Sequence, residues 1–436
     1  MHREPFIMAC TGDFAGQVRG KGFPARELAE RWETGIGWTP TNIMINCFGQ
    51  IQATPWGASG DLTLRPDPAG DVTIDFGDGI APERFILSFV DELNGDPWVC
   101  CPRHYLRMAL AELAEEFGLF LRVAFEHEFT CLGLEPRLGG SYGLESIRTI
   151  GELPEIILAA LDRAQLEPET FLPEYSPGQF EVTVRPAVGL EAADRAVKLR
   201  QIIRAAALRK GLRASFTPIM RRGGVGNGVH VHFSLEDKDG KPLSYDPAGL
   251  GGVSATAGQF IAGILAHGRA LCAVTAPSVI SYERLRPNAW SASVTNLGKQ
   301  DREALVRICP VSEKPGAKVE RSFNFEFRAA DAAATPHLTL GAIVRAGLHG
   351  LRNRLSMPKA ATVIEIANMS EAERSANGIV TLPHSLGEAL DHLDRSEARL
   401  MPLGMKMPYL MHKRGELAQV ADTEIDALCS MYAQVY

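Results

Sequence analysis

The stretch Phe120-Leu-Arg-Val-Ala-Phe-Glu-His-Glu-Phe129 decides the fold. In a β-strand, successive side chains point to opposite faces of the sheet. One face of this stretch would carry Leu121, Val123, Phe125 and Phe129 with His127, and the other Arg122, Glu126 and Glu128. The pattern predicts a strand whose apolar face packs on helices and whose polar face carries carboxylates.

Three more segments repeat this alternation, at Phe180–Arg185, Val229–Phe233 and Phe323–Arg328. Their polar positions include Glu181, His230, His232, Glu326 and Arg328. Any one such strand could simply face solvent. Lysine, a common residue on solvated surfaces, is absent from all four segments, which favours a site over a solvated face.

Neighbouring strands of this kind would bring several carboxylates together, and these cannot all stay ionised without a cation. Oxygen ligands with one imidazole favour Mg²⁺ or Mn²⁺ over zinc. Two such ions beside arginines are typical of phosphoryl transfer from a nucleotide. The glycine-rich segment 223–228 precedes a strand and is therefore not a P-loop. It is either a flexible turn or a loop whose amides approach a substrate anion.

The rest of the chain predicts an α+β protein. Residues 1–101 are rich in glycine and proline, with short strands at 71–76 and 85–90. Pro102 can begin a helix that Gly118 ends. Further helices are expected over 153–164, 190–211, 255–275, 338–351 and 386–399. We therefore expect a small domain over 1–101 and a large domain over 102–436.

Composition excludes several classes of protein. The 436 residues have a net charge of −7, which disfavours nucleic acid or an anionic membrane as partner. The sequence predicts no signal peptide and no membrane span, so a cytoplasmic protein is expected. The eight cysteines form no CxxC and are expected to be reduced, mostly packing residues.

Seven motifs, in order along nearly the whole chain, resemble those of the glutamine synthetase family. They are Gly60–Asp67, Glu126-His-Glu128, Glu174–Glu181, Gly226–Leu235, Ser281-Tyr-Glu-Arg-Leu-Arg-Pro287, Asp301–Arg307, and Glu326-Phe-Arg328 with Asp331 and Thr335–Leu338. The resemblance implies an N-terminal β-grasp domain and a catalytic domain with a curved antiparallel sheet backed by helices. It also implies stacked rings of subunits, suggesting a dodecamer, with active sites between neighbours.

The resemblance further implies residue roles in an ATP-dependent reaction that passes through a γ-glutamyl phosphate. Two or three Mg²⁺ or Mn²⁺ ions are implied, one held by Glu128, Glu174 and Glu181 and the second by Glu126, His230 and Glu326. Nucleotide-contacting positions match His232, Ser234, Arg307 and Arg321. Substrate-binding positions match Gly226, Arg284 and Arg328. Arg302 matches the arginine that stabilises the transferring phosphoryl group, and Arg302 and Arg328 are the candidate catalytic residues.

The sequence departs from ammonia-using members of the family at two places. Trp290 stands where ammonia-using members carry a glutamate that takes a proton from ammonium. Those members also carry an aspartate in an N-terminal segment, and the matching residues 46–51 of this chain contain no aspartate. Trp290 is therefore a candidate contact for an organic amine, or else it only packs the loop. Val225 stands at a family asparagine, which leaves the acid open as glutamate or another carboxylate.

The leading hypothesis is an ATP- and Mg²⁺-dependent ligase that joins glutamate or a related acid to an organic amine, giving a γ-glutamyl amide. The first alternative is an ammonia-using glutamine synthetase. Two alternatives belong to other classes: a metal-dependent hydrolase that uses His230 and His232, and a ring-forming scaffold without catalytic activity.

Overall fold

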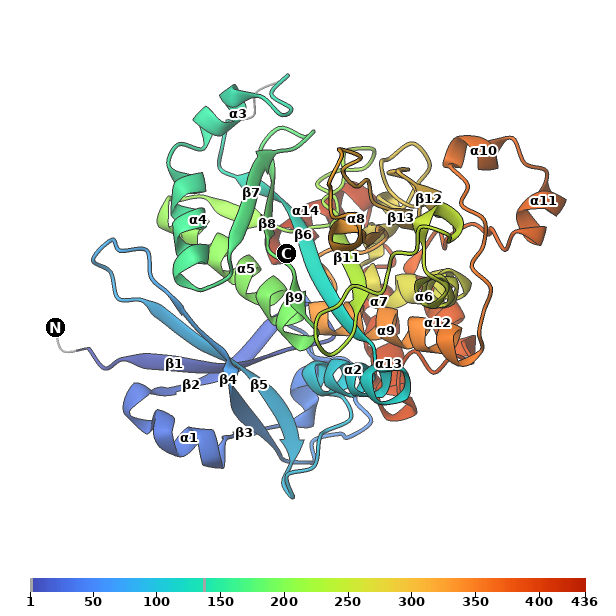
Figure 1. The fold of residues 1–436 in the computed structure, drawn as a ribbon. Helices are drawn as coiled ribbons and strands as arrows, with labels where there is room; N and C mark the ends of the chain where they lie inside the picture. Colours follow the sequence, from blue (N-terminus) through green and yellow to red (C-terminus); the bar gives the residue numbers. More distant parts are fainter. Residues whose placement is uncertain (1–2, 136–138) are drawn as a thin grey trace.

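The computed structural model describes residues 3–135 and 139–436 (Figure 1). A five-stranded sheet forms the N-terminal part, in the order β2 (Val18–Pro24), β1 (Phe6–Gly12), β5 (Glu83–Glu92), β4 (Leu62–Ile74) and β3 (Ile36–Trp38). β1 and β5 pair in parallel and the other pairs are antiparallel. Helix α1 (Leu28–Thr34) packs on β4. This arrangement confirms the expected β-grasp architecture.

A larger sheet forms the second part. Its order is β12 (Leu297–Lys299), β13 (Val306–Ile308), β14 (Phe325–Phe327), β11 (Val229–Glu236), β6 (Phe120–Leu132), β8 (Gln179–Val184) and β7 (Pro168–Pro173). β9 (Ala187–Val188) and β10 (Arg213–Ser215) pair with β6. The pairs are antiparallel except β12 with β13, so the predicted antiparallel sheet is correct apart from this parallel edge.

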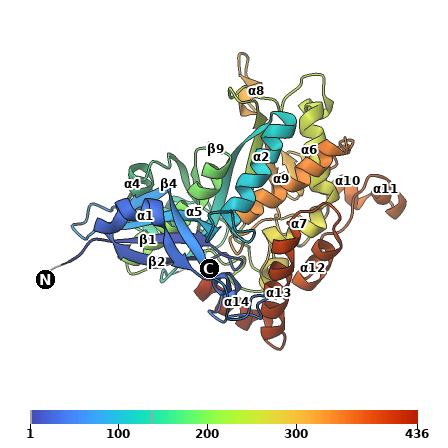
Figure 2. The same ribbon diagram turned by 90° about the horizontal axis from the view of Figure 1, so that it is seen from below.

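Helices cover the apolar face of the larger sheet. α5 (Leu190–Arg209) packs on β6, and α2 (Pro102–Phe117) and α6 (Ala255–Ala266) pack on α9 (Pro336–Arg352), as Figure 2 shows from below. The remaining helices are α3 (Leu144–Thr149), α4 (Leu153–Arg163), α7 (Gly268–Thr275), α8 (Val319–Ser322), α10 (Val363–Ala367), α11 (Glu371–Ala376), α12 (Leu386–Arg395), α13 (Leu403–Gln419) and α14 (Ile425–Val435).

The helix predictions hold with two corrections, the smaller of which is that α12 ends at Arg395 and not at residue 399. α2 begins at Pro102 and ends before Gly118, whose φ of +65° is the left-handed conformation expected there. The single helix expected over 255–275 is wrong, because α6 and α7 are bent by 75° at His267. A Cβ on Gly268 would lie 2.6 Å from a Leu305 methyl group, so the bend occurs where a residue without a side chain packs tightly. The strand expected over 323–328 is shorter than predicted, at 325–327.

Among the residues that the structure describes, no single helix has the length and apolar character to cross a membrane. Only α6 and α7 together meet that test, as a bent pair whose residues are mostly buried in the protein. All eight cysteines are unpaired and buried, as predicted.

The crossing of α6 and α9 has no room for side chains at two glycines. A Cβ on Gly350 would lie 2.1 Å from the carbonyl oxygen of Gln259, and one on Gly263 would lie 2.1 Å from that of Ala346. The two backbones are therefore in direct contact, and α6 in turn packs on β11, where the rings of Phe260 and Phe233 lie 5.8 Å apart.

We predict that Gly350→Ala lowers the free energy of unfolding by about 2 kcal/mol or more, because the backbones must separate. Urea and thermal denaturation measure the change. Gly37→Ala is the control, since no atom lies within 4 Å of the position that its Cβ would take and its φ is not positive; it should change stability by less than about 0.5 kcal/mol. Equal stability of the two variants would contradict the contact.

Candidate active site

The strand register brings the predicted polar residues onto one face of the larger sheet. β14, β11, β6 and β8 are consecutive neighbours, as the sequence pattern required. His230 lies opposite Glu126, and Glu128 lies opposite Glu181. Glu326 lies between His232 on one side and Arg307 on the other. The five glutamates Glu126, Glu128, Glu174, Glu181 and Glu326 are therefore gathered rather than dispersed.

These residues border a cleft of about 950 Å³. The predicted site residues that line it are Glu126, Glu128, Glu174, Glu181, Gly226, His230, His232, Arg284, Trp290, Arg302, Arg307 and Arg328. Glu326 is buried at its floor, with a relative exposure of 1%. Ser234 and Arg321 do not line it among the described residues. Ser234 is half-buried on β11 beyond His232, and Arg321 is exposed on α8.

Carboxylate and imidazole atoms gather in two adjacent groups. Glu128, Glu174 and Glu181 form one, and Glu126, Glu181 and His230 form the other, each with candidate ligand atoms within 4.8 Å of one another. His230 Nδ1 is 3.5 Å from Glu126 Oε2 and also 3.5 Å from Glu326 Oε1. The first ligand set implied by the resemblance is thus compact, and His230 of the second set lies within 3.5 Å of both of its other members, Glu126 and Glu326.

At one end of the cleft the carboxyl groups resist ionisation. Burial, together with the charges of Glu126, Glu128 and Glu174, raises the pKa of Glu181 to about 9. Burial also raises the pKa of Glu128 to about 8, although the backbone N–H of Gly228 donates to it at 2.9 Å. An oxygen-rich site of this kind fits a hard divalent cation, whose charge would let both groups ionise.

At the other end, basic groups keep the carboxylates charged. Burial alone would raise the pKa of Glu326, but the charges of His230, Arg328 and His232 bring it to about 2. Glu126 behaves alike, since His232 and His230 hold its pKa well below the usual value despite burial. Burial favours neutral His232, yet the charge of Glu126 raises the pKa of His232 well above the ordinary range.

Two buried arginines hold the backbone around the cleft. Arg284 donates through Nη2 to the carbonyl oxygens of Ala329 and Ala330, at 2.7 and 2.8 Å. Arg328 donates to Glu326, and through Nε to the carbonyl oxygen of Arg302 at 2.7 Å. A Cβ on Gly226 would lie 2.4 Å from Arg284 Cγ, so this arginine needs the glycine beneath it. Arg302 itself is exposed at the rim.

The loop that carries Trp290 is fixed by its backbone. Asn288 and Trp290 have φ values of +60° and +53°. Their N–H groups donate to the two carboxylate oxygens of Glu303, at 3.3 and 3.2 Å, and the carbonyl oxygen of Trp290 accepts from Arg328 Nη2 at 3.2 Å. Glu303 was not a sequence candidate, although it directly follows Arg302.

The Trp290 side chain belongs to an aromatic group on the rim. Its ring lies 5.4 Å from that of Tyr175, which lies 5.2 Å from that of Tyr142. All three side chains are about half exposed and line the cleft, and the Tyr142 hydroxyl donates to Glu174 at 3.0 Å. The two tyrosines were missed in the sequence because neither lies in a strand pattern.

Two further polar residues of this part of the sequence have structural roles. His127 is buried on the apolar face of β6, as the alternation predicted, and burial lowers its pKa to about 3. Asn227 is buried and bonds Thr217, Thr130 and Gln179, so it fixes the glycine-rich segment and does not line the cleft. That segment is an ordered turn whose Gly228 amide binds Glu128.

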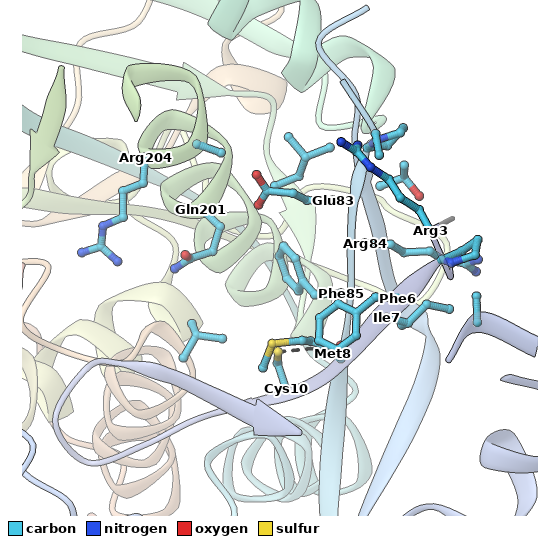
Figure 3. A pocket seen from close by; sticks show the side chains of 18 of the residues that line it. Arg3, Phe6, Ile7, Met8, Cys10, Glu83, Arg84, Phe85, Gln201 and Arg204 are labelled. Atoms are coloured by element: carbon cyan, nitrogen blue, oxygen red, sulfur yellow. Dashed lines mark hydrogen bonds between the residues drawn. The ribbon is translucent and has the colours of Figure 1, made fainter. Parts of the chain in front are cut away.

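A second cavity, of about 900 Å³, lies between β1, β5 and α5 (Figure 3). Its walls are largely apolar, with Phe6, Met8 and Phe85 among them, and it contains none of the residues singled out in the sequence. The acidic cleft is therefore the candidate active site.

Comparison with known proteins agrees with this geometry. The family model for the glutamine synthetase catalytic domain matches residues 99–432, and that for the glutamine synthetase N-terminal domain matches residues 3–98. The chain is 33% identical to the gamma-glutamylpolyamine synthetase GlnA3 of Streptomyces coelicolor, over 97% of this chain and 92% of that protein. It is 31% identical to the glutamine synthetase of Pyrococcus horikoshii, over 96% and 91%.

Solved structures show the same fold. A crystal structure described as a novel glutamine synthase homolog is 40% identical, with a TM-score of 0.92 over 100% of this chain and 99% of that chain. A GmaS/ADP complex, 24% identical, has a TM-score of 0.82 over 98% and 96% and supports the fold alone.

The chain belongs to the glutamine synthetase family. It is an ATP-dependent ligase that forms carbon–nitrogen bonds, and the hydrolase and scaffold alternatives lose their support. Members of the family use ATP and divalent metal ions, and the acidic groups of the cleft could hold such ions.

Because the pKa values of two carboxyl groups in the cleft are raised, we predict that the metal-free protein becomes less stable as pH rises. Glu128 and Glu181 bind protons in the folded state that they release when unfolded, so the free energy of unfolding falls as pH rises from about 5 to about 9. Thermal denaturation in chelator should show this fall, and Mg²⁺ should suppress it.

Glu181→Gln should flatten the pH dependence in chelator, because the amide does not titrate. Glu115→Gln, at an exposed position of α2, is the control and should leave it unchanged. An unaltered pH profile in Glu181→Gln would contradict the assignment of this group.

Proposed function

We propose that the protein joins the side-chain carboxylate of glutamate to an organic amine, giving a γ-glutamyl amide, ADP and phosphate. The carboxylate attacks the γ-phosphorus of ATP and expels ADP; the amine then attacks the acyl carbon and expels phosphate, with loss of a proton. The observation that carries the proposal is an acidic, arginine-bordered cleft whose rim holds an aromatic group in place of a carboxylate.

Each end of the cleft suits one part of that chemistry. We assign one metal ion to Glu128, Glu174 and Glu181, and a second to Glu126, His230 and Glu326, as Mg²⁺ or Mn²⁺ with two or three ions in all. Bound ions would neutralise the phosphates and the developing charge. His232 and Arg307 border the end proposed for the nucleotide, and Ser234 and Arg321 are kept as outer candidates for nucleotide contact.

The arginines supply the remaining positive charge. Arg302, exposed at the rim, is the candidate that stabilises the transferring phosphoryl group. Arg284 and Arg328 have most of their N–H groups engaged by protein oxygen atoms, so they order the wall that meets the acid. Gly226 would offer its backbone to the amino-acid end of the substrate, whose identity as glutamate remains part of the proposal.

The aromatic rim supports an organic amine. Trp290, Tyr175 and Tyr142 present ring faces that can contact alkyl or aromatic groups, or stack on a cation. The segment matching the missing ammonium aspartate carries Asn46, which is buried and bonds its own loop and Gln419. The similarity to GlnA3, a gamma-glutamylpolyamine synthetase, agrees with this interpretation, while the similarity to archaeal glutamine synthetases keeps ammonia as the second candidate.

We also propose a location, an oligomeric state and a domain division for the protein. The enzyme would act on small molecules in the cytoplasm as a homo-oligomer with ring architecture, a dodecamer being the expectation from the family. The domain division is placed at residues 1–101 and 102–436, where α2 begins.

ADP release with glutamate and a panel of ammonia, alkylamines, polyamines and anilines tests the proposal. At least one organic amine should give a higher kcat/KM than ammonia. Ammonia as the best nucleophile would overturn the amine part, and no amine-dependent ADP release with any acid would overturn the ligase assignment.

Trp290→Glu should shift the ratio of kcat/KM values toward ammonia by about tenfold or more, because a carboxylate attracts ammonium and the aromatic contact is lost. Trp290→Phe is the matched control, since it retains a ring and should largely retain the organic amine. An unchanged ratio in Trp290→Glu would mean that the side chain only packs the loop.

Arg302→Ala should bind ATP nearly as tightly as the natural protein but lose about a thousandfold in kcat, because its charge is needed in the transition state. Calorimetry of ATP binding and coupled ADP release measure the two effects. Turnover at the normal rate would remove Arg302 from this role.

A further inference from the structure

Cys309 lies at the end of the cleft proposed for the nucleotide, directly after β13. Its Sγ is 3.6 Å from His232 Nδ1 and 3.9 Å from Glu326 Oε2, and the residue is 7% exposed. One atom from each of His232, Cys309 and Glu326 lies within 4.8 Å of the others. A thiol, an imidazole and a carboxylate therefore converge on one point.

The spacing matches that of a tetrahedral metal site. With Zn–S near 2.3 Å and Zn–N near 2.0–2.1 Å, neighbouring ligand atoms in such a site lie about 3.5 Å apart. The distances from Sγ to His232 and Glu326 are close to this value without movement of the backbone. A mixed sulfur, nitrogen and oxygen set selects zinc-like ions, whereas Mg²⁺ prefers oxygen alone.

The site overlaps only in part with the sets assigned above. Cys309 and His232 belong to neither, and only Glu326 is shared. Binding has an identifiable cost, because His232 Nδ1 contacts Asn324 Oδ1 at 2.9 Å and Arg307 Nη1 donates to Glu326 Oε2 at 2.8 Å. A cation bound to His232 Nδ1 would replace the contact with Asn324. Bound to Glu326, it would neutralise part of the carboxylate charge that Arg307 neutralises in its absence.

We propose that His232, Cys309 and Glu326 form a site for a thiophilic divalent cation such as Zn²⁺. Binding converts the Cys309 thiol to a metal-bound thiolate and removes the proton from His232 Nδ1, and both protons are released to solvent. Three protein ligands leave a fourth position open toward the cleft. The cation would thereby occupy the nucleotide end of the active site, a consequence that rests on the proposed function, whereas the binding itself does not.

Titration of the metal-free, full-length protein with Co²⁺ in excess Mg²⁺ tests the site. One equivalent of Co²⁺ should produce the near-ultraviolet charge-transfer band of a thiolate ligand, and Zn²⁺ should displace it. Cys309→Ser and Cys309→Ala should both lose the band. Their dissociation constants for Zn²⁺ should rise more than about tenfold, since loss of even an outer-shell partner has that effect.

Cys131→Ala is the matched control, because Cys131 is also buried, at 4% exposure, on β6 of the same sheet. It should keep the band, and thermal denaturation verifies that each variant is folded. Absence of the band in the natural protein, its survival in both Cys309 variants, or its loss in Cys131→Ala would overturn the site. The spectrum is independent of turnover, so its outcome is separate from that of the ligase assays.

Discussion

The repulsion among carboxylates on neighbouring strands is the constraint on which the cleft depends. Glu128 and Glu181 are held opposite each other by the β6–β8 ladder, at a spacing that two free carboxylates would avoid. Stabilisation comes from the other face, where Phe125, Phe129 and Val182 are buried. Because apolar and polar side chains alternate along the strands, one face of the sheet forms part of the core and the other face forms the site. Burial of the apolar side chains offsets the free-energy cost of holding the carboxyl groups close together on the opposite face.

The cleft is electrostatically asymmetric before any ligand enters. At the β8 end, burial and mutual repulsion keep carboxyl groups protonated, which is where a divalent cation gains most. At the β14 end, His232, Arg307 and Arg328 surround ionised Glu326, so positive charge is already present. Two chemically different regions thus lie on the same strands: in one the carboxyl groups lack positive partners, and in the other the carboxylates already have basic partners. A phosphate tail that reaches from one to the other meets compensating charge at both ends.

The fold and the site could be predicted where the sequence repeats with the period of a strand or a helix. β6, β8 and β11, with α2 and α5, follow that rule, and their shared polar face unites the glutamates. The bend at His267 depends instead on a distant contact, that of Gly268 with Leu305. Four residues of the site lie in loops or directly after a strand, where periodicity does not indicate which way a side chain points, and they were therefore not predicted. They are Tyr142, Tyr175, Glu303 and Cys309. Motif position alone also does not determine which residues line the cleft, since neither Ser234 nor Arg321 lies at its wall, and their role in nucleotide contact stays a prediction.

The loop of Trp290 shows how selectivity can change without a change of scaffold. Its residues Asn288 and Trp290 adopt left-handed backbone conformations that cost about 1 kcal/mol or more each for residues other than glycine. The compensating hydrogen bonds all involve backbone atoms of the loop, whose N–H groups donate to Glu303 and whose Trp290 carbonyl oxygen accepts from Arg328. These hydrogen bonds hold the loop through its backbone and do not require a particular side chain at position 290. Arg328 also bonds Glu326, so the same guanidinium connects the floor of the cleft to the rim. A substitution at 290 can consequently alter what the rim contacts while the catalytic floor keeps its geometry.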